Sequence, residues 1–373
     1  MTAGFSVWLN LLRAGAAFVV LMSHWAYPRF TDGRWAWVRD YNLGSDAVVL
    51  FFVLSGFVIA YAAYEKDTSF SAFAFARGTR LWSVALPAIL LTYGLDQLGV
   101  YLWPESYAGW WYAPQELGTM LVLGLTFSNE WMGLATRLGT NGPWWSLSYE
   151  VAYYALFAIA FYMGGVRRVV LLTLCALLVG PVILLLMPCW LMGVWLYRRV
   201  TSNDVPDPGL GKYYAVLPVV FYGLLQALGL PMHLMVLTEA LVGPDMPILL
   251  RFSDEVLWNT LLAFGVTLHL WGMASVLRSH DLRQLSRPVA WVAGGSFSLY
   301  VVHYPLLQFL SGGLGVGSGV VGDMTLLVLT IALSLIFAAL FERPLPKLRR
   351  WIGSAVQAAQ TSPSERAQVA KLP

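Results

Sequence analysis

The sequence predicts an all-α, polytopic integral membrane protein with about ten transmembrane helices and with both termini in the cytoplasm. Hydrophobic residues make up 58% of the 373 residues and charged residues only 12%, about half of the roughly 25% that is usual in soluble domains. A soluble chain of this length needs more polar surface to cover its core. The formal net charge of +3 is too small to indicate a nucleic-acid partner.

Apolar runs of about 20 residues mark the predicted helices. Ten such runs lie near residues 6–26, 46–64, 81–100, 146–163, 168–187, 189–198, 213–230, 256–277, 291–311 and 323–342. The sixth run is short and follows Pro188 directly, so the fifth and sixth runs could form one broken hairpin. Two further apolar segments, 117–127 and 231–243, are too short to span a bilayer and are predicted to be interfacial or re-entrant.

The first run, FSVWLNLLRAGAAFVVLMSHW, contains two ionisable residues, Arg13 and His24. An arginine inside the membrane costs about 2.5 kcal/mol or more on insertion scales, so the default hypothesis for such residues is function. The two are eleven residues apart, which places them on one face of a helix and separates them by roughly 16 Å along its axis. The run lacks a signal-peptide cleavage site and is predicted to remain as a transmembrane helix.

The basic residues predict the orientation. With a cytoplasmic N-terminus, 17 basic residues lie in inside loops and the tail: Lys66, Arg77, Arg80, Arg167, Arg168, Arg198, Arg199, Lys212, Arg278, Arg283, Arg287, Arg343, Lys347, Arg349, Arg350, Arg366 and Lys371. Five lie in outside loops: Arg29, Arg34, Arg39, Arg137 and Arg251. This bias favours an even helix count and places Arg13 toward the cytoplasm and His24 at the outer end of the first helix.

Two arginines, Arg77 and Arg80, stand at the predicted cytoplasmic entrance to the third helix. Their i, i+3 spacing presents two guanidiniums side by side on a helix, and two adjacent guanidiniums can grip a phosphate. The alternative is that both are topological anchors whose side chains snorkel to lipid phosphates. Spacing leaves both interpretations open.

Glu150 lies near the outer start of the fourth helix, at roughly the depth of His24. A carboxylate that reaches the imidazole would fix its tautomer and raise its basicity. Alternatively, Glu150 is an acidic residue favoured by the dipole at a helix N-terminus.

In the second helix, Asp46 stands at the outer end and the small pair Ser55-Gly56 at mid-membrane, where small residues allow close helix packing or leave room for a narrow ligand.

Several remaining residues have weaker patterns. His303 lies within the ninth helix and is either a structural, hydrogen-bonded histidine or a functional one. Cys175 and Cys189 have neither metal nor redox spacing and are predicted to pack in the core, so no metal site is expected. The outer loop 101–145 is rich in tryptophan, suited to sugar stacking or to interfacial anchoring: Trp103, Trp110, Trp111, Trp131 and Trp144.

Six motifs stand in a fixed order along the chain: Arg13-x10-His24, FFVLSGF at 51–57, Arg77-x2-Arg80, WSLSYE at 145–150, SFSLYVVHYPL at 296–306 and FERP at 341–344. In these motifs the sequence resembles acyltransferase family 3, a family of integral-membrane O-acyltransferases. The resemblance spans residues from about 5 to 345.

The resemblance implies a ten-helix enzyme of the cell membrane, in bacteria the inner membrane. Such an enzyme transfers an acyl group, usually acetyl, from cytoplasmic acyl-CoA to a hydroxyl of an extracytoplasmic glycan, glycolipid or related acceptor, as in polysaccharide O-acetylation. By the same resemblance His24 matches the catalytic histidine, while Arg13, Arg77 and Arg80 match arginines tied to donor binding. Glu150 is predicted to assist His24. The histidine would act either as a general base or as an acyl carrier.

Two features depart from the family pattern. Val49 stands where many members have an acidic residue, and Asp46 lies one helical turn earlier. After a transmembrane domain over 1–345, only a polar segment over 346–373 follows, predicted to be a disordered cytoplasmic tail. The competing functional class is a transporter whose intramembrane arginine and histidine form a substrate or proton pathway, and a third possibility is a membrane scaffold without chemistry.

Overall fold

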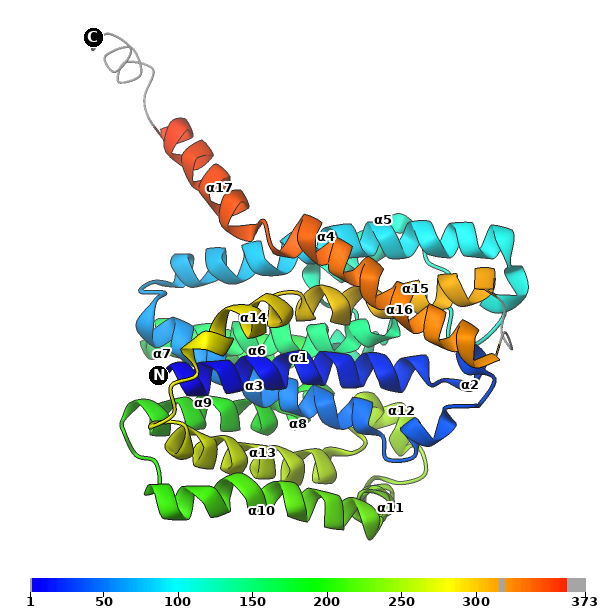
Figure 1. Ribbon diagram of the computed structural model, residues 1–373. Coiled ribbons are helices and arrows are strands. Elements are labelled where there is room, and N and C mark those ends of the chain that lie inside the picture. The colour runs from blue at the N-terminus through cyan, green and yellow to red at the C-terminus, as the bar shows by residue number, and fades with distance from the viewer. Residues whose placement is uncertain (1, 315–318, 361–373) are drawn as a thin grey trace.

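The computed structural model describes residues 2–314 and 319–360. Over these ranges the chain is a bundle of helices without a β-strand, and its long helices run side by side along one direction (Figure 1). The predicted all-α fold class is therefore confirmed.

The helices follow one another in the order α1 (Ala3–Trp25), α2 (Pro28–Thr31), α3 (Leu43–Glu65), α4 (Phe70–Leu102), α5 (Leu117–Thr126), α6 (Trp145–Tyr162), α7 (Gly165–Val179), α8 (Pro181–Leu185), α9 (Met187–Thr201), α10 (Pro208–Ala227), α11 (Leu230–Val242), α12 (Met246–Leu250), α13 (Val256–Val276), α14 (Arg283–Ala293), α15 (Ser296–Leu314), α16 (Gly319–Phe337) and α17 (Leu345–Gln360). A π-helical turn, Ala338–Glu342, follows α16.

Several helical segments have the length and composition of membrane spans. Within the described residues, five segments qualify individually: Ala3–Trp25, Ala36–Glu65, Phe70–Leu102, Met246–Val276 and Gly319–Ser354. A sixth qualifies if α10 and α11, bent by 69° at their junction, count as one broken span. The chain is thus a multi-pass membrane protein, whereas ten crossings and cytoplasmic termini stay predictions.

Three predicted helix boundaries are wrong, and the backbone of a glycine explains one of them. The run 168–187 is not one helix, because Gly180 adopts a φ of +86° after α7 and Pro181 then starts α8. Such a backbone conformation is open to glycine and strained for other residues. The run 291–311 is also divided, at Gly294 and Gly295 between α14 and α15, although Gly294 keeps a negative φ of −71°.

The third correction moves the two spaced arginines. The helix predicted to begin near residue 81 begins at Phe70, because the Ser69 hydroxyl accepts a hydrogen bond from the Ala72 amide at 3.2 Å and caps the helix there. Arg77 and Arg80 therefore lie inside α4 and not at its entrance. They keep the i, i+3 spacing that places both guanidiniums on neighbouring turns.

Helices α3 and α9 pack closely in the core. A Cβ added at Gly56 would stand 2.0 Å from the carbonyl oxygen of Trp190, and one added at Gly193 would stand 2.0 Å from that of Val53. Both glycines therefore let two backbones approach more closely than any side chain allows. The prediction that small residues here permit close packing is confirmed, and the neighbouring Ser55 leaves room for a cavity.

Replacing Gly56 by alanine is expected to destabilise the protein by about 1–3 kcal/mol, because the added methyl group overpacks the contact between α3 and α9. The midpoint of thermal unfolding in detergent measures this loss. Gly94→Ala in α4 is the matched control, since no atom lies within 4 Å of the added Cβ. A midpoint for Gly56→Ala equal to that of wild type would contradict the described packing.

The C-terminal helix reaches back onto the bundle. Arg349 of α17 donates to the Thr79 hydroxyl at 2.9 Å and to the Ala76 carbonyl at 2.5 Å, both on α4. The start of α1 and the end of α17 lie toward the same end of the bundle (Figure 1). The segment predicted as a disordered tail thus begins as a helix, and its last part, 361–373, lies outside the described residues. The division into a domain over 1–345 and a tail stays a prediction.

Candidate active site

The two ionisable residues of α1 contact two successive helices, α14 and α15. Arg13 donates through Nη2 to the carbonyl of Ala293, at the end of α14, at 2.8 Å. His24 pairs through Nδ1 with Nε2 of His303, on α15, at 2.8 Å. The predicted shared face therefore exists, and it packs against α14 and α15.

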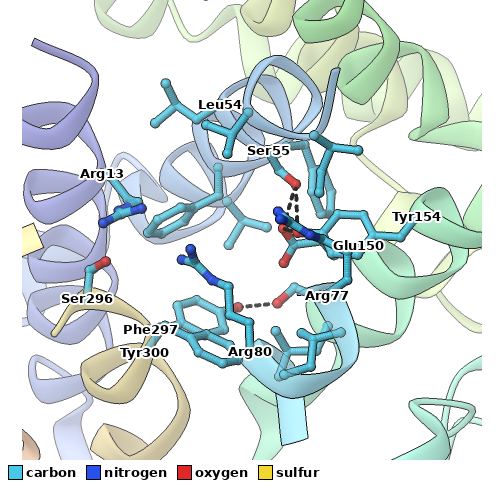
Figure 2. Close-up of a pocket in the computed structure, with 18 residues that line it drawn as sticks. Arg13, Leu54, Ser55, Arg77, Arg80, Glu150, Tyr154, Ser296, Phe297 and Tyr300 are labelled. Atoms are coloured by element: carbon cyan, nitrogen blue, oxygen red, sulfur yellow. Dashed lines mark hydrogen bonds between the residues drawn. The ribbon is translucent and has the colours of Figure 1, made fainter. Parts of the chain in front are cut away.

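Arg13 faces a narrow cavity of about 110 Å³ between α1, α3, α4, α6 and α15. We call it the arginine cavity; its polar lining includes Arg13, Ser55, Arg77, Arg80, Glu150 and Tyr300. Figure 2 shows the three arginine side chains reaching into this one space from α1 and α4. The three arginines that the sequence singled out for the donor are thus brought together.

The charges in the arginine cavity are only partly neutralised. Arg77 forms an ion pair with Asp67, with an Nη2 to Oδ2 distance of 3.4 Å. Neither Arg13 nor Arg80 forms an ion pair with a carboxylate of the described residues. Half-buried guanidiniums without carboxylate partners favour an anionic ligand, because an unpaired and partly desolvated charge is costly.

Glu150 belongs to the arginine cavity and not to His24. Its Oε1 accepts hydrogen bonds from the Ser55 and Tyr154 hydroxyls, each at 2.5 Å (Figure 2). The Trp190 indole donates to the Ser55 oxygen at 3.2 Å and holds that hydroxyl in place. Neither alternative for Glu150 describes its position: no hydrogen bond joins it to the imidazole, and α6 begins at Trp145 with no acidic residue in its first turn. A position along one helix does not fix which helices a residue faces, and here Glu150 faces Ser55 of α3.

His24 faces a second, larger cavity of about 620 Å³. We call it the histidine cavity; its lining includes His24, Arg39, Glu130, Arg137, Trp145 and Tyr300. The Trp145 indole stacks on Phe252, with ring centroids 4.3 Å apart and planes 4° from parallel. This cavity therefore offers charged groups and an aromatic surface beside the imidazole.

The two cavities share a wall. Val48 of α3 and Tyr300 of α15 line both the arginine cavity and the histidine cavity. The Tyr300 hydroxyl is held by Ser146 at 2.5 Å and donates to the Pro143 carbonyl at 3.2 Å. The side chains of Val48 and Tyr300 thus separate the cavity lined by the arginines from the cavity lined by His24.

Comparisons with known proteins identify the family of the chain. The family model described as an acyltransferase domain, that of acyltransferase family 3, matches residues 6–343. The chain belongs to acyltransferase family 3. It is also 33% identical over 155 residues to acyltransferase MdmB of Streptomyces mycarofaciens. That match covers 40% of this chain and 38% of the relative, so it compares less than half of either protein. No solved structure matches the chain.

Asp46, the acidic residue one helical turn before Val49, lines neither cavity. Its carboxylate accepts hydrogen bonds from Trp258 at 2.7 Å, from Tyr222 at 2.7 Å and from Gln226 at 2.8 Å. These partners lie on α13 and α10. In this member of acyltransferase family 3, Asp46 therefore joins α3 to two other helices.

Tyr300 and Ser146 were missed as site residues by sequence reasoning. Both lie within motifs that carried the resemblance to acyltransferase family 3, which is the signal that could have found them. Of the six tryptophans in the range 101–145, the five that the sequence singled out line neither cavity, and Trp144 is fully buried against Phe127. The aromatic surface of the histidine cavity comes instead from Trp145, the next residue along the chain.

The histidine cavity is also lined by an ion pair between two loop residues. Glu130 forms an ion pair with Arg251 at 3.2 Å. Burial raises the pKa of Glu130 to about 7, and the Arg251 guanidinium opposes that rise. The histidine cavity of this acyltransferase-family chain therefore holds a carboxyl group that titrates near neutral pH.

Within the described ranges no group of three or more histidine, cysteine or acidic residues could hold a metal ion.

Proposed function

We propose that this chain is an O-acyltransferase of the cell membrane, in bacteria the inner membrane. It moves an acyl group, most simply acetyl, from cytoplasmic acyl-CoA to a hydroxyl of an extracytoplasmic glycan, glycolipid or related acceptor. The observation that carries the proposal is the shared wall: three arginines line one cavity, His24 lines the other, and Val48 and Tyr300 line both.

The arginine cavity suits the donor. Acyl-CoA is anionic at its nucleotide end and thin along its pantetheine arm, so phosphates would lie against Arg77 and Arg80 while the arm enters the narrow part of the cavity. The thioester at the tip of the arm would then reach the wall formed by Val48 and Tyr300. In this proposal the two spaced arginines bind the donor rather than anchor the chain.

The histidine cavity suits the acceptor. It is several times larger than the arginine cavity, and a sugar ring can pack its C–H face on the surface of Trp145 while its hydroxyls bond to the charged groups around it. Arg39 and Arg137 are two such groups. An acceptor hydroxyl placed beside His24 would face the thioester across the wall.

The proposed chemistry needs one group that accepts a proton. His24 takes the proton of the acceptor hydroxyl, the oxygen attacks the thioester carbonyl, the C–S bond breaks, and the CoA sulfur leaves as a thiol after receiving a proton. General-base catalysis of this kind contributes about 10²–10⁴-fold. In the other route the imidazole attacks the thioester first and carries the acyl group to the acceptor. Both routes use the same nitrogen.

Incubating the purified protein in detergent with acetyl-CoA and candidate glycans tests the proposal. The expected result is release of free CoA thiol, detected with a thiol reagent, together with an acetylated product of matching amount by mass spectrometry. A transporter in liposomes would instead move its substrate without cleaving the thioester. A scaffold would do neither.

The orientation gives a separate prediction, from the bias of basic residues. After Cys175 and Cys189 are replaced, a cysteine at Ala108 is expected to react with an impermeant thiol reagent in intact cells, and a cysteine at Ser354 only after the cells are opened. Both positions are exposed. The reverse pattern would put the arginine cavity on the side without acyl-CoA and would end the proposal of transfer across the membrane.

A further inference from the structure

The imidazoles of His24 and His303 form a pair between α1 and α15. The Nδ1 of His24 lies 2.8 Å from the Nε2 of His303, and the ring centroids are 5.1 Å apart. Exactly one proton lies between two neutral imidazole nitrogens that share a hydrogen bond, so one ring must donate and the other accept. The rest of the structure decides which.

The other nitrogen of His303 faces two backbone carbonyls. Its Nδ1 lies 3.0 Å from the oxygen of Leu299 and 2.8 Å from that of Tyr300, one turn earlier in α15. A carbonyl oxygen only accepts hydrogen bonds, so Nδ1 of His303 carries the proton. In the neutral ring, Nε2 then bears a lone pair, and His24 must donate to it from Nδ1.

The consequence reaches the histidine cavity. Because the proton of neutral His24 is on Nδ1, its lone pair is on Nε2. This nitrogen makes no hydrogen bond with any residue of the described ranges, and the His24 side chain lines the cavity. The ring is further fixed by Tyr27, stacked at 6.0 Å, and by Tyr304, edge-on at 5.0 Å between centroids.

We propose that His303 is a positioning residue, which holds His24 in the tautomer whose Nε2 lone pair faces the histidine cavity. The carbonyls of Leu299 and Tyr300 keep a proton on Nδ1 of His303. The free lone pair on Nε2 of His303 then keeps a proton on Nδ1 of His24. The effect on turnover rests on the proposed function, whereas the tautomer itself is a property of the resting protein.

The same pairing serves the proposed reaction. When Nε2 of His24 takes the proton of the acceptor hydroxyl, the new imidazolium keeps its hydrogen bond from Nδ1 to the lone pair of His303. When Nε2 gives that proton to the departing CoA sulfur, His24 returns to its starting tautomer. No proton is gained or lost over the cycle. A ring in the opposite tautomer would present an N–H to the acceptor and could not begin either route.

Two substitutions separate positioning from packing. His303→Leu removes the acceptor for His24 Nδ1, and we expect turnover to fall by about 10–100-fold, the usual effect of losing a partner of this kind, with an unchanged KM for acetyl-CoA. His303→Gln supplies an amide oxygen that can accept the same proton, so most of the turnover should return. His269→Leu is the matched control, because this histidine also bonds a carbonyl, that of Ala215 at 2.6 Å, yet lines neither cavity.

A direct readout follows from 15N NMR of the full-length protein labelled at histidine, since protonated and unprotonated ring nitrogens differ in chemical shift. The His24 signals are assigned by their loss in His24→Ala. In wild type and His269→Leu, Nδ1 of His24 should be protonated and Nε2 unprotonated. In His303→Leu the fraction protonated at Nε2 should rise. This measurement requires only the folded protein and no substrate.

The outcomes separate this inference from the proposed function. A wild-type His24 protonated at Nε2, or a tautomer unchanged in His303→Leu, would overturn the role of His303 while leaving acyl transfer intact. Equal losses of turnover in His303→Leu and His303→Gln would also overturn it, because both variants would then act only through packing. The predicted tautomers in a protein that never cleaves acetyl-CoA would leave the pairing established and remove the proposed function.

Discussion

Replacing His24 by alanine is expected to abolish acyl transfer, with a fall of at least about 10²-fold and toward 10⁴-fold in thioester cleavage. The reason is that no other described residue presents an imidazole to the histidine cavity. Both proposed routes, general base and acyl carrier, pass through this ring. The measurement is release of CoA thiol from acetyl-CoA by the purified protein, normalised to the amount of folded protein.

His233→Ala provides the control for this experiment. His233 is exposed, and its ring contacts only the carbonyl of Gly229 at the start of its own helix. Its loss should leave turnover and expression unchanged. If His24→Ala kept about half of the wild-type turnover, neither proposed role for His24 could stand, and the shared wall would have to serve another reaction.

Loss of Arg80 is expected to raise the KM for acetyl-CoA by about 10–100-fold, because one charge-assisted hydrogen bond to phosphate contributes about 1.5–3 kcal/mol. Arg80 is chosen over Arg77 because Arg77 is paired with Asp67, which loses its own partner when the arginine is removed. Acetyl-pantetheine, which lacks the nucleotide phosphates, should be used equally by Arg80→Ala and wild type. The paired substrates therefore locate the effect at the phosphates.

The control here is Arg167→Ala, which removes one exposed charge from the predicted cytoplasmic surface without touching either cavity. Its KM should match that of wild type, although both variants change the net charge equally. An unchanged KM in Arg80→Ala would show that this arginine is a topological anchor, which was the second interpretation of its spacing.

The parts of the fold that follow from local composition were predictable. A long apolar run forms a helix in a membrane whatever its neighbours are, and a periodicity of 3.6 residues fixes that Arg13 and His24 share a face. Helix ends were less predictable. Gly180 breaks a run that composition alone joins, and Ser69 caps a helix that begins at Phe70, well before the predicted run 81–100.

The partners of the site residues could not be read from spacing. His24 meets a histidine 279 residues away, and that contact depends on how α1 and α15 rotate about their axes. Glu150 faces Ser55 and Tyr154, because α6 presents that side to α3. The position of a residue along its helix follows from counting residues, whereas the helices that its side chain contacts depend on how the whole bundle packs. The resemblance in ordered motifs supplied the residues, and the structure supplied their pairing.

The wall of Val48 and Tyr300 bears on how such a protein keeps a membrane sealed. In the proposed reaction neither the nucleotide nor the glycan crosses, and only a two-carbon unit passes between side chains. A cell that modified its outer surface by exporting an activated donor would need a pore wide enough for a nucleotide, and the membrane potential would drive ions through it. In the proposed reaction the side chains of Val48 and Tyr300 would separate the two sides, so the outward chemistry would need no open pore.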